Sequence, residues 1–305
     1  MDYVIETNDL NKQFGTVHAV SGLNLRVARN QVTGFLGRNG AGKSTTIKML
    51  LGMTHPTSGS GLLLGRSITD PKQDQEARRK VAYCGEDKQL YAYMTVQQLI
   101  RFTASFYPDW RSDVASRLLD QFQLPPDRKI KALSKGMRTK LALLLALARQ
   151  PALLILDEPT EGLDPVSIEE LLQTLSGLPA DGTTVFFSSH QIAEVERIAD
   201  RVCVIDHGRL AVDLSLDEIR RDHRRITLSF SHPPPEHLFD MPEVQSIQTS
   251  GRQMVLISSH GAEAIVERAR SIQGVVVDVA PVSLRELFLE TVQDRESRIT
   301  NDAAL

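Results

Sequence analysis

The stretch GFLGRNGAGKSTTIKML, residues 34–50, decides the fold. An apolar run precedes it and a helical run that stops at Gly52 follows it, so its G-x-x-x-x-G-K-S pattern lies between a predicted strand and a predicted helix. Glycines in such a loop let successive backbone N–H groups face one centre at a helix N-terminus, which favours an anion. We therefore predict that Gly37–Ser44 binds nucleotide phosphates, with Lys43 on the β- and γ-phosphates and the Ser44 hydroxyl on Mg²⁺.

The composition is that of a globular chain. The 305 residues carry a formal net charge of −3 and are 41% hydrophobic, which suits a packed core and gives no support for nucleic-acid binding. The longest apolar run, residues 141–148, is shorter than the roughly 18 residues of a bilayer span, and the N-terminus does not resemble a signal peptide. Cys84 and Cys203 lie in apolar runs and are expected to be buried, reduced thiols. We expect any membrane part of the system to come from a partner.

Two kinds of sheet are predicted. The first thirty residues favour an antiparallel flap, with YVIET as one strand and LNLRV, in which Leu23, Leu25 and Val27 alternate, as another. Residues 54–65 are rich in turn-forming residues and predict a hairpin. Farther along, LLIL and TVFF are continuous apolar runs that alternate with helical segments, which is typical of a parallel sheet buried on both faces.

Polar side chains end two of the buried strands. ALLILDEP leads to Asp157-Glu158, and TVFFSSH ends in His190. Because ligands of such sheets bind beyond the carboxyl ends of the strands, we expect these residues beside Gly37–Ser44. Asp157 then points toward the Mg²⁺ shell, and Glu158 lies where a carboxylate can polarise a water that attacks the γ-phosphate in line.

The rest of the chain completes the predicted architecture. A helical insertion occupies about residues 88–150, and residues 223–305 alternate short strands and helices around the proline-rich SHPPPEH. The two histidines in that segment, His232 and His237, leave a metal site or a solvated loop open. The predicted fold is an α/β P-loop ATPase core with a parallel sheet, an antiparallel β flap and a helical insertion, in residues 1–222. A small C-terminal α+β domain follows in residues 223–305.

Over about residues 4–222 the motifs resemble those of the nucleotide-binding subunit of an ABC transporter. GRNGAGKST is similar to the Walker A loop of that family, LLILDEP to Walker B, and LSKGM at 133–137 to its signature. GLD at 162–164 is similar to the D-loop, and His190 to the switch histidine. Phe14, which by residue type alone packs in the core or stacks on a base, falls on the adenine-stacking aromatic of the family.

The resemblance implies an ATP hydrolase that uses ATP and Mg²⁺. Two copies, or one copy and a related cassette, then pack head to tail with two ATP molecules between them, each on one Walker A loop and under the opposite signature. Glu158, His190 and Glu86 are the implied catalytic residues, and Ser44, Asp157 and Glu86 are the implied metal ligands. The implied ATP-binding residues are Phe14, Gly37, Asn39, Gly40, Ala41, Gly42, Lys43, Ser44, Thr45, Ser134, Lys135, Gly136 and Asp164.

The signature and the Walker A loop depart from the family pattern. Lys135 and Met137 replace a usual Gly and Gln, whereas Ser134 and Gly136, the implied phosphate contacts, are retained. Lys135 adds a positive charge near the phosphates. Arg38 replaces a common Pro, and nothing in the sequence explains it.

Glu86 is a further departure, because it stands where the family usually has the Q-loop Gln. A carboxylate can ligate Mg²⁺, but it also repels the γ-phosphate. Its role therefore stays open, and Gln89 is the other candidate for the Q-loop position.

Glu86, LSKGM and the segment PVSLRELFLE together resemble a subset of bacterial exporter cassettes whose membrane subunit is a separate protein. This implies export through an integral permease, with the chain cytoplasmic and peripheral on the inner face of the cell membrane, and no nucleic-acid partner. Residues 87–96 and the aromatic FYPDW either face that permease or pack inside the insertion. One alternative is a soluble ABC-type ATPase that acts on ribosomes or DNA, although the chain has neither a second cassette nor a long coiled coil. Another is a non-catalytic cassette, against which Glu158 and His190 argue.

Overall fold

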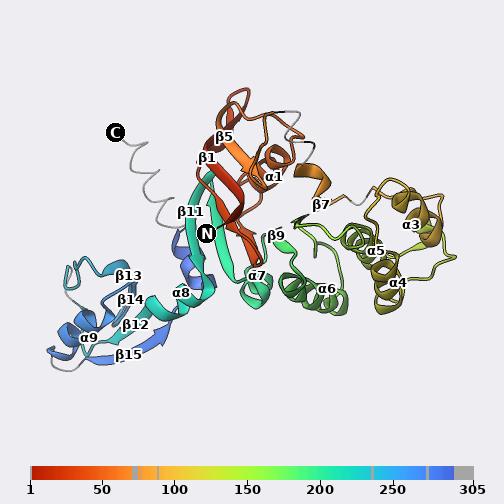
Figure 1. Ribbon diagram of the computed structural model, residues 1–305. Helices are drawn as coiled ribbons and strands as arrows, with labels where there is room; N and C mark the ends of the chain where they lie inside the picture. The colour runs from red at the N-terminus through yellow and green to blue at the C-terminus, as the bar shows by residue number, and fades with distance from the viewer. Residues whose placement is uncertain are drawn as a thin grey trace. The chain divides into compact units, whose positions relative to one another are not determined.

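The computed structural model describes residues 2–70, 75, 77–87, 89–234, 237–272 and 275–291 (Figure 1). It divides into two compact units, residues 1–213 and 214–305. The predicted insertion begins at Lys88, which lies outside the described residues.

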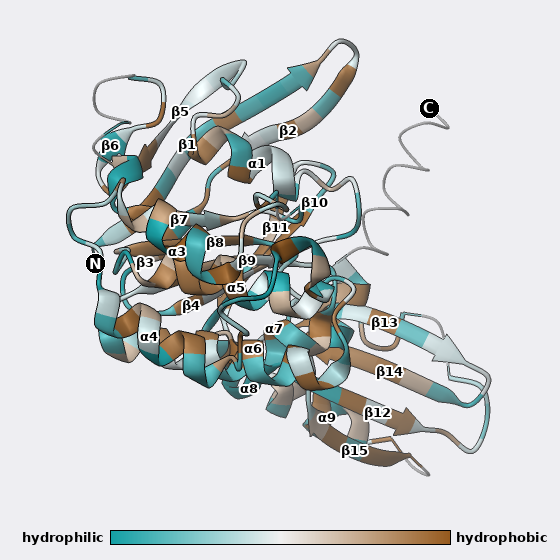
Figure 2. Ribbon diagram, turned by 90° about the vertical axis from the view of Figure 1, so that its right-hand side faces the viewer, coloured by the Kyte–Doolittle hydropathy of each residue, from teal (hydrophilic) through white to brown (hydrophobic). Residues whose placement is uncertain are grey.

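A six-stranded sheet forms the centre of the first unit. Its strands, from edge to edge, are β11 (Arg209–Ser215), β10 (Arg201–Asp206), β4 (Val32–Leu36), β9 (Thr184–Ser189), β8 (Leu153–Asp157) and β7 (Val81–Cys84). The five strands from β10 to β7 pair in parallel. Every residue of β4, β8 and β9 is buried, and Figure 2 colours these central strands largely as hydrophobic. The prediction of a parallel sheet buried on both faces is confirmed.

A second, antiparallel sheet forms the flap. Its strands follow the order β2-β1-β5-β6, and β3 also pairs with β1. Their bounds are β1 (Tyr3–Phe14), β2 (Val17–Leu23), β3 (Arg26–Ala28), β5 (Ser58–Leu63) and β6 (Arg66–Ser67). The apolar core of the unit includes side chains from β1 and β2 of this flap, from β4 and β8 of the central sheet and from helix α1.

Two predicted elements of the flap were wrong in detail. LNLRV is not one strand: β2 ends at Leu23 and β3 begins at Arg26, although Leu23, Leu25 and Val27 are all buried as their alternation predicts. Residues 54–65 do not form a hairpin of their own, because β5 pairs with the distant β1 along most of its length. The hairpin in this region is formed by β5 and the following strand β6, which Leu64 and Gly65 connect.

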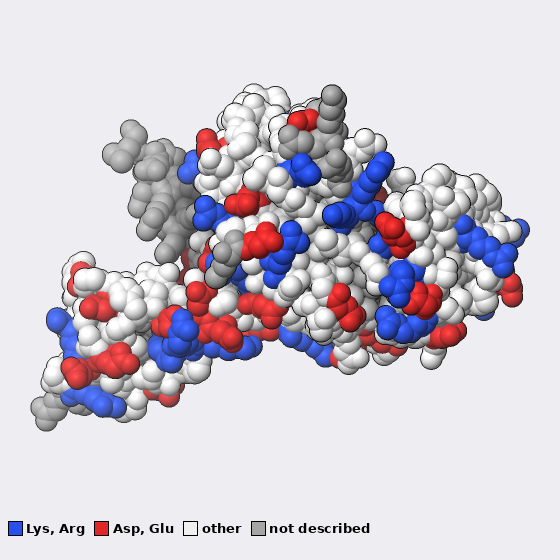
Figure 3. All heavy atoms as spheres, in the orientation of Figure 1, with Lys and Arg blue, Asp and Glu red and all other residues white. Residues whose placement is uncertain are grey.

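Helices cover the central sheet and form the insertion. They are α1 (Lys43–Leu50), α3 (Val96–Ala104), α4 (Ser112–Gln121), η1 (Ile130–Ala132), α5 (Lys135–Leu147), α6 (Pro165–Gly177), η2 (Leu178–Asp181) and α7 (Ile192–Ile198). Thr95 begins α3 with a capping box to Gln98, and the leucine-rich end of α5 is buried as predicted. Figure 3 shows that the surface over α3 is largely free of charged atoms. Within the described part of the chain, no helix has the length and apolarity needed to cross a bilayer.

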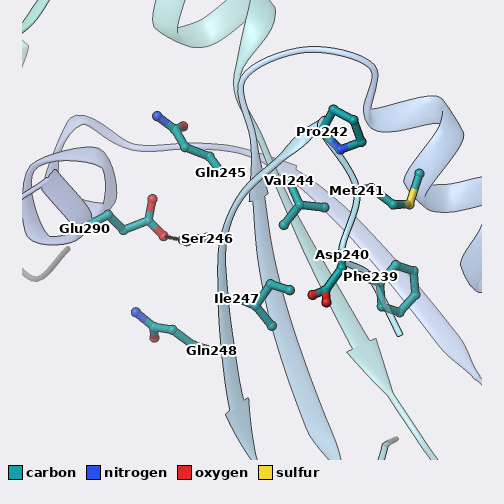
Figure 4. Close-up of a pocket in the computed structure, with 10 residues that line it drawn as sticks. All are labelled: Phe239, Asp240, Met241, Pro242, Val244, Gln245, Ser246, Ile247, Gln248 and Glu290. Atoms are coloured by element: carbon teal, nitrogen blue, oxygen red, sulfur yellow. Dashed lines mark hydrogen bonds between the residues drawn. The ribbon is translucent and has the colours of Figure 1, made fainter. Parts of the chain in front are cut away.

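The second unit has its own sheet and core. Its elements are α8 (Leu216–Asp222), β12 (Arg224–Ser229), β13 (Val244–Ser250), β14 (Gln253–Ser258), α9 (Ala262–Arg270) and β15 (Val276–Pro281), and residues 284–291 are also helical. The strands pair antiparallel in the order β13-β14-β12-β15, and a separate cluster of apolar side chains packs between this sheet and α9. A groove of about 720 Å³ runs beside β13, where Ser246 donates a hydrogen bond to Glu290 (Figure 4). None of the predicted site residues lines this groove.

Candidate functional site

The glycine-rich loop between β4 and α1 has the close backbone packing that only glycine permits. A Cβ atom on Gly42, whose φ is +108°, would lie 2.4 Å from the carbonyl oxygen of Ala19, and one on Gly37 would lie 2.5 Å from that of Ile205. Lys43 begins α1, and its buried ammonium donates a hydrogen bond of 2.7 Å to the Gly37 carbonyl. The loop therefore folds over its own lysine, whose ammonium also donates to the Arg38 carbonyl at 3.3 Å.

Asp157 lies at the carboxyl end of β8 and is almost fully buried. It accepts hydrogen bonds from Ser44 Oγ at 3.2 Å and from Ser188 Oγ at 2.6 Å. Asp157 and Ser44 thus present neighbouring hard oxygen atoms at the base of the glycine-rich loop. This donor set fits Mg²⁺, which is usually held by one or two protein groups together with waters and substrate phosphates. No larger cluster of His, Cys, Asp and Glu that could hold a metal occurs among the described residues.

Glu158, the next residue, is held in an unusual conformation. Its φ is +47°, which is uncommon for a residue with a side chain and implies that the surroundings impose it. Its backbone N–H donates to Ser188 Oγ at 3.0 Å, so the neighbouring strand β9 fixes the turn. The turn places the carboxylate beside the glycine-rich loop rather than in the core below it.

The Glu158 carboxylate joins two other predicted site residues. One oxygen lies 3.1 Å from the Lys43 ammonium, and the other lies 2.9 Å from Nδ1 of His190. The same oxygen also accepts from the His190 backbone N–H at 3.3 Å. Three residues that follow three adjacent parallel strands therefore meet at one point, as the position of the strand ends predicts.

A cavity of about 310 Å³ opens above this point. It is lined by Ala19, Arg38, Asn39, Gly40, Gly42, Lys43, Ser44, Thr45, Glu86, Glu158, Glu161 and His190. Six of the eight predicted site residues between Gly37 and Thr45 therefore line the cavity, whereas Gly37 and the buried Ala41 do not.

Glu86 lines the cavity beside a second carboxylate that the sequence analysis did not single out. A hydrogen bond to Glu161, and then the charge of Glu161, raise the pKa of Glu86 above its ordinary value. Gln89, the other candidate for this position, is exposed and does not line the cavity.

Outside the glycine-rich loop, five predicted ATP-binding residues do not line the cavity of their own chain. Phe14 ends β1 on the flap, where about half of its side chain is exposed and the Lys12 ammonium lies 4.8 Å from its ring centroid. Ser134 caps α5 by accepting from the Met137 N–H at 3.1 Å, and Lys135 and Gly136 follow it. Asp164, the fifth, caps α6 instead.

Asp164 accepts hydrogen bonds from the N–H groups of Val166 and Ser167 and from Ser167 Oγ at 2.7 Å. The Ser167 hydrogen bonds lower its pKa. Gly136 packs against this cap, because a Cβ atom on it would lie 2.9 Å from Ser167 Oγ. The beginnings of α5 and α6 are therefore in contact, away from the cavity.

Sequence reasoning also missed Glu194, a buried carboxylate on α7. One of its oxygens accepts from Thr160 Oγ1 at 2.7 Å and from Ser189 Oγ at 3.0 Å. Thr160 lies two residues after Glu158, and Ser189 directly precedes His190, so Glu194 ties together the segments that follow β8 and β9. Burial raises its pKa. The sequence shows a glutamate four residues after His190, but it does not show that this residue lies on the buried face of the helix.

Comparison with known proteins gives consistent matches. The family model described as "ABC transporter" matches residues 20–161. The chain is 35% identical over 228 residues to the bacitracin transport ATP-binding protein BcrA of Bacillus licheniformis, covering 74% of each chain. It is 32% identical over 293 residues to the Nod factor export ATP-binding protein I of Rhizobium sp. (strain N33), covering 93% of this chain and 95% of the relative. The second match therefore extends into the second unit.

Solved structures with a similar fold include subunits of ABC transporters. A structure described as the ATP binding subunit of an ABC transporter is 32% identical and has a TM-score of 0.64, covering 72% of this chain and 92% of its own. CbiO1 from Clostridium perfringens, described as part of the ABC transporter complex cbiONQ, is 29% identical with a TM-score of 0.63. A dimeric, post-hydrolysis structure of the cassette MJ0796 bound to ADP and Pi is 23% identical with a TM-score of 0.62, which shows the shared fold.

Proposed function

The chain belongs to the ABC transporter family as an ATP-binding, ATP-hydrolysing cassette, and from that premise we propose that it powers export through a separate membrane permease. The observation that carries the proposal is the meeting of Lys43, Glu158 and His190 under the cavity. Relatives named for bacitracin transport and for Nod factor export support export as the direction of transport. The transported substrate does not follow from the cassette, because substrates bind to the permease.

The site residues divide the chemistry between them. The loop N–H groups and Lys43 hold the β- and γ-phosphates. Glu158 accepts a proton from the attacking water, and its hydrogen bond to His190 orients the carboxylate for this role. His190 in turn faces the γ-phosphate across the cavity. The surrounding burial of Lys43 and Glu158 strengthens each of these interactions.

We propose Mg²⁺ as the resident metal, with Ser44 and Asp157 as its protein-side partners. Mg²⁺ would supply charge neutralisation between the β- and γ-phosphates. Glu86 faces the same cavity, but its pairing with Glu161 leaves less free charge for a metal. Glu86 stays a proposed metal ligand and a proposed catalytic residue.

The signature supports a head-to-tail dimer. Ser134, Lys135 and Gly136 begin a helix whose N-terminus favours a phosphate, yet they do not line the cavity of their own chain. A second cassette, turned to face the first, would bring each signature over the opposite nucleotide. Asp164, at the neighbouring helix start, would then face the partner as well. ATP binding closes this dimer and hydrolysis reopens it, which is the stroke that moves the permease.

An exposed aromatic surface, formed by Tyr91, Tyr93, Phe102 and Phe106, is the proposed contact with the permease. Their rings touch in series, with centroids 5.0 to 5.9 Å apart, and Tyr93 and Phe106 are 68% and 63% exposed. Other aromatic residues of FYPDW are partly buried, and Tyr107 packs on Arg149 inside the insertion. A contiguous exposed aromatic group marks an interaction site. This surface would hold the chain peripherally on the inner face of the cell membrane.

The experiment that tests the export proposal is affinity purification from detergent-solubilised native membranes, using tagged Glu158→Gln protein with ATP and Mg²⁺. We expect an integral membrane protein to co-purify in stoichiometric amount. Recovery of ribosomes or DNA with no membrane protein would retain the ATPase and contradict the transport proposal.

A further inference from the structure

The side chain of Lys135 lies across Gly162 of the same chain. A Cβ atom on Gly162 would lie 2.5 Å from Nζ of Lys135, 3.1 Å from its Cδ and 3.2 Å from its Cε. Contact therefore runs along the whole outer half of the lysine, not only at its charged tip. Gly162 has a φ of +66° and belongs to the loop that connects Glu158 to α6.

A second contact lies directly beside the first. Gly136 packs on Ser167, at the beginning of α6, and Ser167 is bonded to Asp164. Two consecutive residues of the signature thus touch two points of the segment 162–167. The signature and this segment come from distant parts of the sequence, and both lie outside the cavity of their own chain.

The contact made by Lys135 is not an ion pair. Among the residues that the structure describes, no carboxylate is recorded within salt-bridge distance of its ammonium, and the side chain is exposed overall. A lysine commonly lays its aliphatic stem along a surface and leaves the charge in water. A glycine at position 135, which the family pattern has, would offer no stem and no such contact.

We propose that Lys135 is a positioning residue that braces residues 159–164 of its own chain, so that the signature and the D-loop move as one surface. The proposal rests on the proposed function in one respect: in a head-to-tail dimer, these two segments would face the nucleotide held by the opposite copy. The outer half of the Lys135 side chain, from Cδ to Nζ, provides the brace.

The first test separates the stem from the charge and needs neither ATP nor a dimer. Amide hydrogen exchange of residues 159–164 is measured in the full-length chain as Lys135→Ala and Lys135→Met. The alanine removes the stem, and the methionine keeps a stem of similar length without charge. We expect exchange about threefold or more faster in Lys135→Ala and close to wild type in Lys135→Met. Equal exchange in all three proteins, or the same rise in both variants, would overturn the brace. Exchange in the middle of α6 should be unchanged and serves as the control.

The second test is a double-mutant cycle on ATP hydrolysis. Gly162→Ala adds a methyl group at the position of the Lys135 side chain and also strains a positive φ. We expect it to lower kcat about tenfold in the wild-type background and about threefold or less with Lys135→Ala, because only the backbone strain then remains. An equal factor in both backgrounds would contradict the proposal. A chain that shows the exchange difference but no ATP-dependent dimer would disprove the proposed function and leave the brace intact.

Discussion

The Lys43 ammonium and the Glu158 carboxylate form a buried ion pair, with 3.1 Å between Nζ and Oε1. The lysine belongs to the phosphate-binding loop, and the glutamate is the proposed base for the attacking water. A γ-phosphate that binds Lys43 must therefore compete with Glu158 for the same ammonium. When the γ-phosphate replaces Glu158 on Lys43, the Glu158 carboxylate becomes free to accept a proton from the attacking water.

This competition predicts that Glu158→Gln binds ATP more tightly than the wild type. The amide is a weaker partner for Lys43 and does not repel the triphosphate, so we expect the Kd to fall about three- to tenfold. Hydrolysis should fall about 100-fold or more, because a positioned base contributes 10²–10⁴-fold. Fluorescent-nucleotide titration and phosphate release measure the two effects. Glu263→Gln, a change at an exposed residue of α9, is the control and should alter neither. Weaker ATP binding by Glu158→Gln would contradict the competition.

Glu86→Gln should leave ATP binding within about twofold of wild type and change kcat by about threefold or more. The amide keeps a hydrogen bond to Glu161 but removes the negative charge of residue 86 itself. The γ-phosphate then meets a neutral side chain at this side of the cavity. Steady-state kinetics with separate Kd measurements distinguish the two effects. An unchanged kcat would remove Glu86 from the catalytic residues, and Glu161→Gln is the matched comparison for its partner.

Glu194→Ala should lower the rate of ATP hydrolysis, although Glu194 does not line the cavity. Loss of the carboxylate leaves the hydroxyls of Thr160 and Ser189 without their buried acceptor, which costs about 1–3 kcal/mol for a buried polar group. The spacing between Glu158 and His190 then loosens, so we expect kcat to fall more than the apparent affinity for ATP. Thermal unfolding and steady-state kinetics test this. A variant with lower stability but an unchanged kcat would limit Glu194 to a structural role.

The buried Glu194 also predicts a pH dependence of stability. Burial raises its pKa in the folded chain, so the folded state binds the proton more tightly than the unfolded state, whose value is about 4.3. The contribution of this group is therefore most favourable below about pH 4.3 and is lost as the pH rises through the folded-state pKa. Glu194→Gln does not titrate, so its melting temperature relative to wild type should increase from about pH 4 to pH 7. A constant difference across that range would contradict the assignment.

Charges on the aromatic surface should disconnect the cassette from its permease. Phe102→Glu with Phe106→Glu places two carboxylates where apolar rings now meet. We expect loss of permease co-purification, while ATP hydrolysis by the isolated cassette stays within about twofold. Leu62→Glu, at a flap residue with the same 39% exposure as Phe102, is the matched control and should retain the permease. If the double variant still co-purifies with the permease, the aromatic surface is not the contact.

The parts of the fold that sequence predicts well are those fixed by local pattern. LLIL and TVFF are apolar at every position because both faces of β8 and β9 are covered, and the glycine spacing of the phosphate loop follows from contacts as tight as Gly42 on Ala19. Their strand ends then place Asp157, Glu158 and His190 together with no further information.

The parts that sequence missed depend on partners far along the chain. Residues 54–65 carry turn signals, but β5 takes its pairing from β1, about fifty residues earlier in the sequence. Glu161 and Glu194 read as ordinary surface glutamates until the fold places one beside Glu86 and the other under Thr160. The contact of Lys135 with Gly162 likewise joins two segments whose proximity no local pattern encodes.

The most direct test of the account is the mass of Glu158→Gln protein in sedimentation, with and without ATP and Mg²⁺. The account predicts a monomer of the 33.9-kDa chain without nucleotide and a particle of twice that mass with it. Addition of a chelator together with dilution of ATP should return the monomer. A protein that binds ATP but stays monomeric at every concentration would contradict the head-to-tail mechanism, and with it the proposed way in which this cassette drives a permease.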